Sequence, residues 1–472
     1  MVDVRRGGKC GRKLSDFTRD GGFKERPPST DGPIISTWLK FHHAMVDIQP
    51  VNGYNSSMLV QRYITPLVEI ALLDTPAVYI QGPRQAGKST LVQMLSEKTG
   101  RRYLSLDDAA TLAAARTDPG GFLARFDGPI AIDEVQAAPE LGRAIKAAID
   151  RDRKPGKFLL TGSAGIMVIP ELALQLVGRM ELLTLWPLAQ REITGTHGSM
   201  IDELLAEKFV STPINSEGRQ KLLARLIAGG YPEPLQRTTS ESKGRWFDSY
   251  ETTILQRDVR DLANVESLGI FPNLLRLLAG RDMSILNVAD VARTLSLPQT
   301  TVKRYLAVLS GLFLTGSLPA WHRNATARLA KAPKAMLVDT GLACHLMDLD
   351  MDRLEANSTM AGHLVENLAA MELIKQAGWA KTRSEFFHFR TLSGAEVDLV
   401  LEDRRGRVVG IEVKFSQTLS KTDLRGMEVL RQAAGQNFLR GIIFYSGHET
   451  LPFGPDCWAV PIDALWNGVK SP

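Results

Sequence analysis

The sequence predicts an α/β protein whose first folded part is a parallel sheet flanked by helices. Short apolar runs at residues 77–80, 129–132 and 157–161 have the length and composition of buried strands. A helix-like segment, residues 91–99, follows the first run, and strands that alternate with helices are typical of a parallel sheet. After about residue 186 the sequence becomes largely helical, and near the C-terminus strand patterns return.

The composition is that of an ordinary globular protein with several domains. With 472 residues, 44% hydrophobic and 23% charged, the chain is neither wholly disordered nor a collagen or long coiled coil. No stretch approaches the roughly 20 apolar residues that a membrane-spanning helix needs. The scattered cysteines Cys10, Cys344 and Cys457 form neither a disulfide framework nor a paired zinc signature. We therefore expect a cytoplasmic protein without a membrane partner.

An N-terminal leader contributes much of the net charge of +5. Residues 1–57 contain nine basic and six acidic residues, whereas the remaining chain contains 48 and 46. Glycine, proline and charged residues dominate this leader without a helical or strand period, so we expect it to be disordered. Periodic sequence begins near Met58, and whether the native protein starts there stays open. The net charge is weak support for nucleic-acid binding.

The segment from Gly82 to Thr90 has the G-x-x-x-x-G-K-[ST] pattern of a phosphate-binding loop, between a strand and a helix. Glycines let backbone N–H groups turn toward phosphates, and the following helix N-terminus favours negative charge. We expect Lys88 to reach the β- and γ-phosphates of ATP and the Ser89 hydroxyl to ligate Mg²⁺. The expected nucleotide contacts are Gly82, Pro83, Arg84, Gln85, Ala86, Gly87, Lys88, Ser89 and Thr90.

Acidic and polar residues end the second and third apolar runs. We expect Asp133 to hold Mg²⁺, usually through water, and Glu134 to act as general base on the attacking water. After the third run, Ser163 is the preferred sensor of the γ-phosphate and Thr161 the second choice. Capping of a helix is an equally weighted alternative for Ser163.

Arg179 lies beyond the third run, in the segment Val177-Gly178-Arg179. An arginine there can contact the γ-phosphate in its own chain or in a neighbouring subunit. Action between subunits requires a homo-oligomer, whereas action within one chain does not. An ordinary salt bridge is the alternative role, and the choice between these readings stays open.

Four motifs follow one another as GPRQAGKST, IAIDE, FLLTGSA and VGRM. In this order they resemble the AAA-type ATPases of bacteria and archaea that are fused to a C-terminal domain of unknown function, number 4143. The resemblance runs from about residue 59 to the end and implies ATP binding and hydrolysis. It also implies that Arg179 corresponds to the family's Gly-Arg position. GGYPEP at residues 229–234 and Arg257-Asp258 resemble further family segments, for which we expect interdomain packing, with nucleotide sensing by the arginine as the alternative.

The segment 282–321 has the outline of a winged helix-turn-helix. A short amphipathic helix from residue 287, a turn at Ser296-Leu297-Pro298 and a second helix from Gln299 precede a strand-forming wing. In such folds the second helix can enter the DNA major groove, where Thr300, Lys303 and Arg304 would be exposed. Two basic residues are a thin footprint for phosphate binding. DNA contact and a structural connector therefore both stay open.

Near the C-terminus, two alternating runs flank the turn Arg404-Arg405-Gly406 and predict a β-hairpin. In this hairpin each residue of one strand pairs with the residue of the other strand for which the two residue numbers add to 810. This register places Asp398 opposite Glu412 and Glu396 opposite Lys414, with all four polar groups on one face of the sheet. On the other face, Val397 with Val413, Leu399 with Ile411 and Leu401 with Val409 form an apolar floor.

This hairpin resembles the core of the PD-(D/E)xK nuclease superfamily, although Ala395-Glu396-Val397 lacks the proline that names the motif. The resemblance implies that Asp398 and Glu412 bind Mg²⁺, that Lys414 lies beside the nucleophile, and that Glu366 is the helix glutamate of the superfamily. Surface stabilisation by cross-strand ion pairs is the alternative, and a nuclease-like fold does not by itself imply cleavage.

Together these patterns predict four segments and three functional hypotheses. The segments are a leader at 1–57, an AAA-type ATPase domain at 58–190, a helical region with the winged helix at 191–330, and a nuclease-like domain at 331–472. The leading hypothesis is an ATPase that uses ATP and Mg²⁺ and couples nucleotide state to the other modules. The alternatives are an ATP-regulated DNA endonuclease and an ATP-gated adaptor that binds DNA or a protein partner without cutting it.

Overall fold

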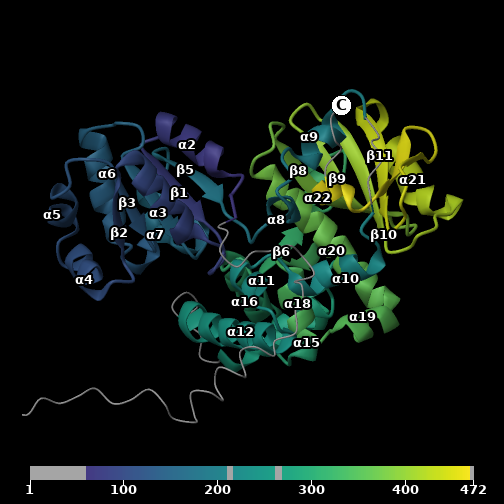
Figure 1. Cartoon of the computed structure of the whole chain (residues 1–472), viewed down its shortest axis with the longest axis horizontal. Helices are drawn as coiled ribbons and strands as arrows, with labels where there is room; N and C mark the ends of the chain where they lie inside the picture. The colour runs from purple at the N-terminus through teal and green to yellow at the C-terminus, as the bar shows by residue number, and fades with distance from the viewer. Residues whose placement is uncertain (1–59, 210–215, 261–267, 468–472) are drawn as a thin grey trace, which may run out of the picture. The chain divides into compact units, whose positions relative to one another are not determined.

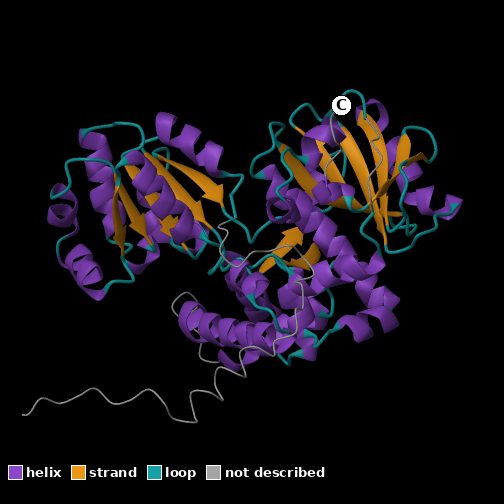
Figure 2. Cartoon of the chain, viewed as in Figure 1, coloured by secondary structure: helices purple, strands orange, loops and turns teal. Residues whose placement is uncertain are grey.

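The structure is a computed structural model that describes residues 60–209, 216–260 and 268–467. The expected leader, residues 1–57, lies outside this range. The α/β fold class is confirmed, because helices surround a five-stranded parallel sheet and a six-stranded mixed sheet (Figure 2). Within the described residues, no helix has both the length and the apolar character needed to cross a membrane.

The five-stranded sheet is wholly parallel and contains all three apolar runs expected from the sequence. Its strand order is β2-β3-β4-β1-β5. The central strands β1, β3 and β4 are almost entirely buried because helices cover both faces of the sheet. The strands are β1 Ala77–Gln81, β2 Arg102–Ser105, β3 Ile130–Asp133, β4 Phe158–Gly162 and β5 Met180–Thr184.

Two apolar clusters cover the two faces of this sheet. Val78 and Ile80 of β1 belong to the cluster of α2 and α3, while Ala77 and Tyr79 belong to that of α6 and α7. The alternation follows from the two-residue period of a strand. The helices here are α2 Thr65–Asp74, α3 Lys88–Thr99, α4 Ala109–Thr117, α5 Pro119–Ala124, α6 Leu141–Arg151 and α7 Pro170–Leu176 (Figure 1).

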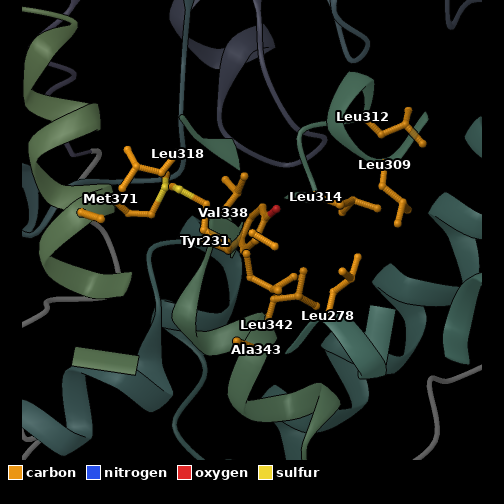
Figure 3. Close-up of a cluster of buried hydrophobic side chains, with 14 of the residues drawn as sticks. Tyr231, Leu278, Leu309, Leu312, Leu314, Leu318, Val338, Leu342, Ala343 and Met371 are labelled. Carbon is orange, nitrogen blue, oxygen red and sulfur yellow. The ribbon is translucent and has the colours of Figure 1, made fainter. Parts of the chain in front are cut away.

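Residues 190–356 are mainly helical. Their buried side chains, among them Tyr231, Leu278, Leu309 and Leu342, gather in one apolar cluster (Figure 3). The helices are α8 Gln190–Thr194, α9 Met200–Leu205, α10 Arg219–Ala228, α11 Pro232–Gln236, α12 Ser240–Thr253, α14 Phe271–Ala279, α15 Val288–Thr294, α16 Gln299–Gly311, α17 Ala325–Ala330, α18 Thr340–Leu346 and α19 Met351–Ala356.

The two helices and the strand expected in the segment 282–321 are present as α15, α16 and β6 Thr315–Leu318. Strand β6 pairs antiparallel with β7 Lys334–Leu337. The expected exposed positions on α16, Thr300, Lys303 and Arg304, do face solvent. DNA binding by this unit remains a prediction.

The glycine pair Gly229-Gly230 joins three distant parts of the sequence. The Gly230 N–H donates to Asp339 at 2.7 Å, and the Gly230 carbonyl accepts from the Leu188 N–H at 2.7 Å. Lys375 Nζ donates to the Leu188 carbonyl at 3.1 Å. A Cβ at Gly229 would lie 2.3 Å from Asp339 Oδ1, and one at Gly230 would lie 2.4 Å from the Leu188 carbonyl oxygen. Only glycine fits such contacts, so the expected packing role of this segment agrees with its surroundings.

The C-terminal sheet is mixed, with the strand order β12-β13-β11-β10-β9-β8. Helix α20 contacts β10 from one side, and α21, beside β10 and β11 in Figure 1, packs with Met427 and Leu430 against Val397 and Val400. The elements are α20 Ser358–Ala377, β8 Ser384–Arg390, β9 Glu396–Asp403, β10 Val408–Lys414, α21 Arg425–Ala434, β11 Phe438–Tyr445, β12 Leu451–Pro452, β13 Cys457–Pro461 and α22 Ala464–Asn467.

The predicted hairpin register is confirmed at the turn end of β9 and β10. Leu399 pairs with Ile411 and Leu401 with Val409, and Gly406 has the expected left-handed conformation with φ +76°. The predicted contact between Val397 and Val413 is wrong, because these two residues belong to different apolar clusters.

The physical reason is a β-bulge at Asp398-Leu399. Between the pairs Phe387–Val400 and Phe389–Val397, strand β8 has one residue and β9 has two. The extra residue reverses the alternation of side chains, so Val397 shares a face with Val400 instead of Leu399. On the side of Leu399 that is farther from the turn, the Asp398 carboxylate accepts a hydrogen bond from the Val413 N–H at 2.8 Å.

Candidate functional site

The loop between β1 and α3 has the backbone of a phosphate cradle. Gly82 and Gly87 have φ values of +153° and +95°, and a Cβ at Gly82 would lie 2.1 Å from the Leu185 carbonyl oxygen. Gln85 has φ +62°, a left-handed conformation that is costly for a residue other than glycine. Such strain concentrates at ligand sites, where the surrounding structure maintains it.

Lys88 is the first residue of α3, and its side chain turns back to this loop and is 4% exposed. Its ammonium donates hydrogen bonds to the carbonyls of Gly82 at 3.0 Å and Pro83 at 2.8 Å. Burial lowers the pKa of Lys88 to about 8, although the nearby carboxylates of Glu134 and Asp133 act in the opposite direction. A buried cation held only by carbonyls is well placed to bind an anionic ligand.

Asp133 and Glu134 lie at the carboxyl end of β3 and share the hydroxyl of Thr161. That hydroxyl donates to Asp133 and accepts from the Glu134 N–H at 3.0 Å. Tyr103 donates to the second Asp133 oxygen at 2.8 Å. Thr161, the second choice for a sensor, therefore contacts both acidic residues directly.

Glu134 is buried and has φ +57°. The Gln136 amide donates both to the Glu134 carboxylate and to Ser163 Oγ, the latter at 2.9 Å. Burial alone would raise the pKa of Glu134, but the charge of Lys88 and the Gln136 hydrogen bond hold it below its ordinary value. Glu134 is thus ionised and able to accept a proton, while Ser163 joins the site through Gln136.

The oxygen donors at this edge fit a magnesium ion. Ser89 is half-buried in the first turn of α3, and Asp133 offers a carboxylate at the end of the neighbouring β3. Mg²⁺ in nucleotide sites takes one or two protein oxygens and completes its shell with phosphate oxygens and water. Within the described residues, no group of three or more His, Cys, Asp or Glu side chains gathers for a metal ion.

Arg179 is not brought to this edge, which corrects the expected contact with the γ-phosphate within one chain. It immediately precedes β5 and bonds through its carbonyl to the Ala77 N–H, at the amino end of β1. The phosphate loop follows the opposite end of β1, one strand length or about 13 Å away. The Arg179 side chain forms an exposed ion pair with Asp150 at 2.7 Å. Parallel strands place their amino ends at the same edge of the sheet. A residue that precedes β5 therefore lies at the edge opposite the loop that follows β1.

Side chains from the helical region reach the phosphate loop instead. Arg84 Nε donates to Asp258 at 2.5 Å, and Tyr250 donates to the Arg84 carbonyl at 3.4 Å. Arg257 pairs with Asp107, which follows β2, at 3.2 Å. The loop after β4 is also held, since Gly165 N–H donates to the Gly311 carbonyl of α16 at 2.7 Å.

The four residues predicted for a nuclease-like site fall into two ion-paired groups. Lys334 of β7 approaches Glu366 at 2.6 Å, Glu396 at 3.1 Å and Asp398 at 3.6 Å. Lys414 pairs with Glu412 at 2.6 Å. The structure thus brings Glu366 and Asp398 around Lys334, and it pairs Glu396 with Lys334 instead of the expected Lys414.

Burial shapes the protonation of this carboxylate cluster. It raises the pKa of Glu366 well above the ordinary range, and the charge of Asp398 acts in the same direction. Burial also raises the pKa of Glu412 to about 8, again assisted by Asp398 and opposed by Lys414. The surrounding carboxylates overcome burial and raise the pKa of Lys334. Burial therefore favours the neutral form of Glu366 and Glu412, while the surrounding carboxylates favour the charged form of Lys334.

Comparison with known proteins matches three separate parts of the chain to family models. Family models match residues 74–194 as an AAA domain, 219–353 as a domain of unknown function (DUF8612) and 361–465 as a domain of unknown function (DUF4143). The uncharacterized proteins Rv2008c of Mycobacterium tuberculosis and Mb2031c of Mycobacterium bovis are each 30% identical over 455 residues, covering 94% of this chain and 91% of theirs. This chain belongs to their family.

Solved structures that resemble this family member include two motor or ATPase proteins. The Walker-type ATPase PABY2304 of Pyrococcus abyssi is 13% identical, with a TM-score of 0.40, over 64% of this chain and 99% of its own. The RuvB Holliday junction branch migration motor of Thermotoga maritima is 15% identical, with a TM-score of 0.28, over 54% of this chain and 89% of its own.

Four residues of the two sites were not predicted from the sequence. Tyr103 and Gln136 belong to no motif; Gln136 follows a predicted strand end, whereas Tyr103 lies in β2, for which no strand was predicted. Arg62 donates to the Ala86 carbonyl at 2.6 Å and pairs with Glu192 at 3.0 Å, which fixes the back of the phosphate loop. Lys334 reaches its cluster from another sheet, and the only signal in the sequence is that it directly precedes the apolar run 335–338.

Proposed function

We propose that the protein is a Mg²⁺-dependent ATPase that couples nucleotide state to its helical and C-terminal parts. The observation that carries this proposal is the buried ammonium of Lys88, which is held by loop carbonyls and faces the carboxylates of Asp133 and Glu134. This is the charge arrangement that a polyphosphate with a bound cation would complete. The AAA-domain match over residues 74–194 supports the same activity.

Each residue then has a role that follows from its place. Lys88 and the loop N–H groups bind the phosphates, and Ser89 and Asp133 hold the cation. Bound Mg²⁺ neutralises charge that develops on the phosphate oxygens. Glu134 takes a proton from the attacking water, and Gln136 orients its carboxylate. Thr161 and Ser163 link this base to the loop after β4.

The contacts described above offer a route for coupling. Gly165, two residues after Ser163, is bonded to Gly311 at the end of α16. A Cβ at Gly311 would lie 2.5 Å from Val168, so the two segments are in close contact. A shift of the loop after β4 would therefore displace α16, which belongs to the expected winged helix.

Two variants test the proposed activity. Lys88→Ala should abolish ATP binding, since it removes the buried cation that the phosphates need. Glu134→Gln should retain ATP but hydrolyse it about 10²- to 10⁴-fold more slowly, because the base is lost. Lys98→Ala is the matched control, since Lys98 lies on the same helix with an exposed side chain. Absence of Mg²⁺-dependent ATP binding by the wild type would refute the proposal.

For the C-terminal part we propose a non-catalytic role in binding or packing over DNA cleavage. Lys334 forms ion pairs with the carboxylates that a nuclease would offer to its metal ions. The convergence of Glu366 and Asp398 keeps a metal-dependent endonuclease as the second candidate. Incubation of the protein with supercoiled plasmid and Mg²⁺ or Mn²⁺ separates the two roles. Nicking by wild type that Lys414→Ala abolishes would establish cleavage.

A further inference from the structure

Asp258 contacts the phosphate loop although it lies 174 residues from its partner Arg84. The ion pair joins Arg84 Nε to Asp258 Oδ2 at 2.5 Å, and the two side chains are 19% and 9% exposed. Both ions of a largely buried pair lose hydration, so the pair persists only where its geometry offsets that cost. The expected nucleotide contact Arg84 is therefore already bound to an internal anion.

The segment that carries Asp258 is unusual. Residues Ile254–Asp258 form a π-helical turn after α12, and such turns are rare and are frequent at functional sites. Tyr250 of α12 donates to the Arg84 carbonyl and shares a hydrogen bond of 2.7 Å with the hydroxyl of Tyr231. The end of α12 and the π-helical turn, residues 250–258, therefore contact Arg84 through both its side chain and its backbone.

Arg84 and Asp258 also lie close to the ammonium of Lys88. The charges of Arg84 and Asp258 both influence the pKa of Lys88, after the larger effects of burial, Glu134 and Asp133. Arg84 is thus within electrostatic reach of the place where phosphates would bind. A guanidinium forms the same charge-assisted hydrogen bonds with carboxylate and phosphate, so one can replace the other as its partner.

We propose that Asp258 competes with the phosphates of a bound nucleoside triphosphate for Arg84. Without nucleotide, Asp258 holds Arg84 and fixes the segment 250–258 on the loop. With nucleotide, Arg84 turns to the phosphates and the segment loses its ion pair. Asp258 is a positioning residue in this scheme, because it acts on nucleotide through Arg84. The inference rests on the proposed ATP binding and adds the device by which the helical region senses it.

If Asp258 competes with the phosphates for Arg84, its removal changes ATP affinity in a way that the loss of a merely structural residue would not. Removal of Asp258 should tighten ATP binding, since Arg84 no longer has to leave a partner. If Arg84 is free in about one molecule in ten, Asp258→Ala should tighten the apparent affinity by about tenfold. Arg84→Ala should weaken binding, and adding Asp258→Ala to Arg84→Ala should then change nothing.

The experiment is a double-variant cycle on the full chain, with Mg²⁺–ATP titrated calorimetrically into wild type, Arg84→Ala, Asp258→Ala and the double variant. Tightening by Asp258→Ala only when Arg84 is present supports the proposal. Equal tightening in both backgrounds means simple charge repulsion and overturns it, as do weaker or unchanged binding. Absence of binding by wild type overturns the proposed ATPase as well, so the two failures are distinguishable.

Three further measurements guard against a folding artefact. Asp248→Ala removes an exposed carboxylate from α12, the helix that precedes the π-helical turn, and should leave ATP affinity unchanged. Asp258→Asn should give an affinity between wild type and Asp258→Ala, because an amide still accepts a hydrogen bond but carries no charge. Hydrogen exchange in residues 246–258 should accelerate when ATP binds to wild type. Asp258→Ala should show fast exchange with or without ATP, and an ATP effect that persists in it would overturn the proposal.

Discussion

Lys88 and Lys334 are both buried lysines beside acidic residues, yet their partners differ. Lys88 is 4% exposed and bonds to two backbone carbonyls, and burial lowers its pKa to about 8. Lys334 is 2% exposed and lies within 3.6 Å of three carboxylates, which raise its pKa. Among the described residues Lys88 forms no direct ion pair, although the charges of Glu134 and Asp133 act on it, whereas Lys334 forms three.

The difference in charged partners distinguishes a site that needs a ligand to balance its lysine from a site whose own carboxylates already do so. A buried charge without an ionic partner costs stability and is retained where a ligand supplies the partner. A buried charge with several partners holds the surrounding elements together and offers little to a ligand. The same residue types, lysine with aspartate and glutamate, therefore support a nucleotide site in one place and an internal salt-bridge cluster in the other.

The largest expected effect comes from replacing each lysine by methionine. Lys334→Met should lower the free energy of unfolding by about 3–5 kcal/mol, because Glu366 and Asp398 lose their buried counter-ion. Lys88→Met should lower it by less than Lys334→Met does, because relief of the buried ammonium offsets the loss of its attraction to Glu134. Urea unfolding at neutral pH measures both.

A control variant shows whether the carboxylates left without a counter-ion explain the stability lost in Lys334→Met. Lys334→Met combined with Glu366→Leu should recover part of the stability, because the most buried carboxyl group is removed together with its partner. Equal destabilisation by Lys88→Met and Lys334→Met would show that the two lysines do not differ as described.

A second effect, at most of similar size, should follow the titration of Glu412. Its folded-state pKa of about 8 exceeds the ordinary value of 4.5, so its contribution to stability is full below about pH 4.5 and is lost as pH rises toward 8. Glu412→Gln removes this titration. Its stability relative to wild type should therefore increase between pH 5 and pH 8, by at most about 1.4 kcal/mol per pH unit.

Urea unfolding at several pH values measures this slope. Glu428→Gln is the matched control, because Glu428 is exposed on the adjacent helix α21. A stability difference between Glu412→Gln and wild type that does not change with pH would mean that Glu412 is ionised throughout, as a metal ligand would be.

The smallest expected effect is that of Arg179→Ala on ATP hydrolysis. Arg179 forms an exposed ion pair with Asp150 and lies at the sheet edge opposite the phosphate loop, so the rate should stay unchanged. Asp150→Ala breaks the same ion pair and serves as the control. A large loss with Arg179→Ala alone, together with an oligomer in sedimentation, would mean that Arg179 completes the nucleotide site of another chain.

The sequence predicted features that depend on neighbours in the chain. The phosphate loop follows from residue types between one strand and one helix, and the hairpin register follows from a short turn with Gly406 at φ +76°. Alternation with a period of two predicted the pairs Leu399–Ile411 and Leu401–Val409. It could not predict the bulge at Asp398, because nothing local requires an extra residue there.

Partners that come from distant elements were beyond sequence reasoning. Lys334 approaches Asp398 from another sheet, and Asp258 approaches Arg84 from a helix 174 residues away. A charged residue shows in the sequence that it needs a partner when it lies in an apolar run, but the partner's identity depends on tertiary packing. For Arg179, a motif position suggested a nucleotide contact that the parallel strand order does not allow within one chain.

The pair Gly229-Gly230 has a consequence for how this architecture can be recombined. Its contacts with Leu188, Asp339 and Lys375 leave no room for a β-carbon. A chimera that joined the N-terminal part of one relative to the C-terminal part of another would therefore have to transplant matching surfaces around both glycines. Because neither glycine leaves room for a β-carbon, even an alanine at one of these two positions would disturb the contact between the three matched regions.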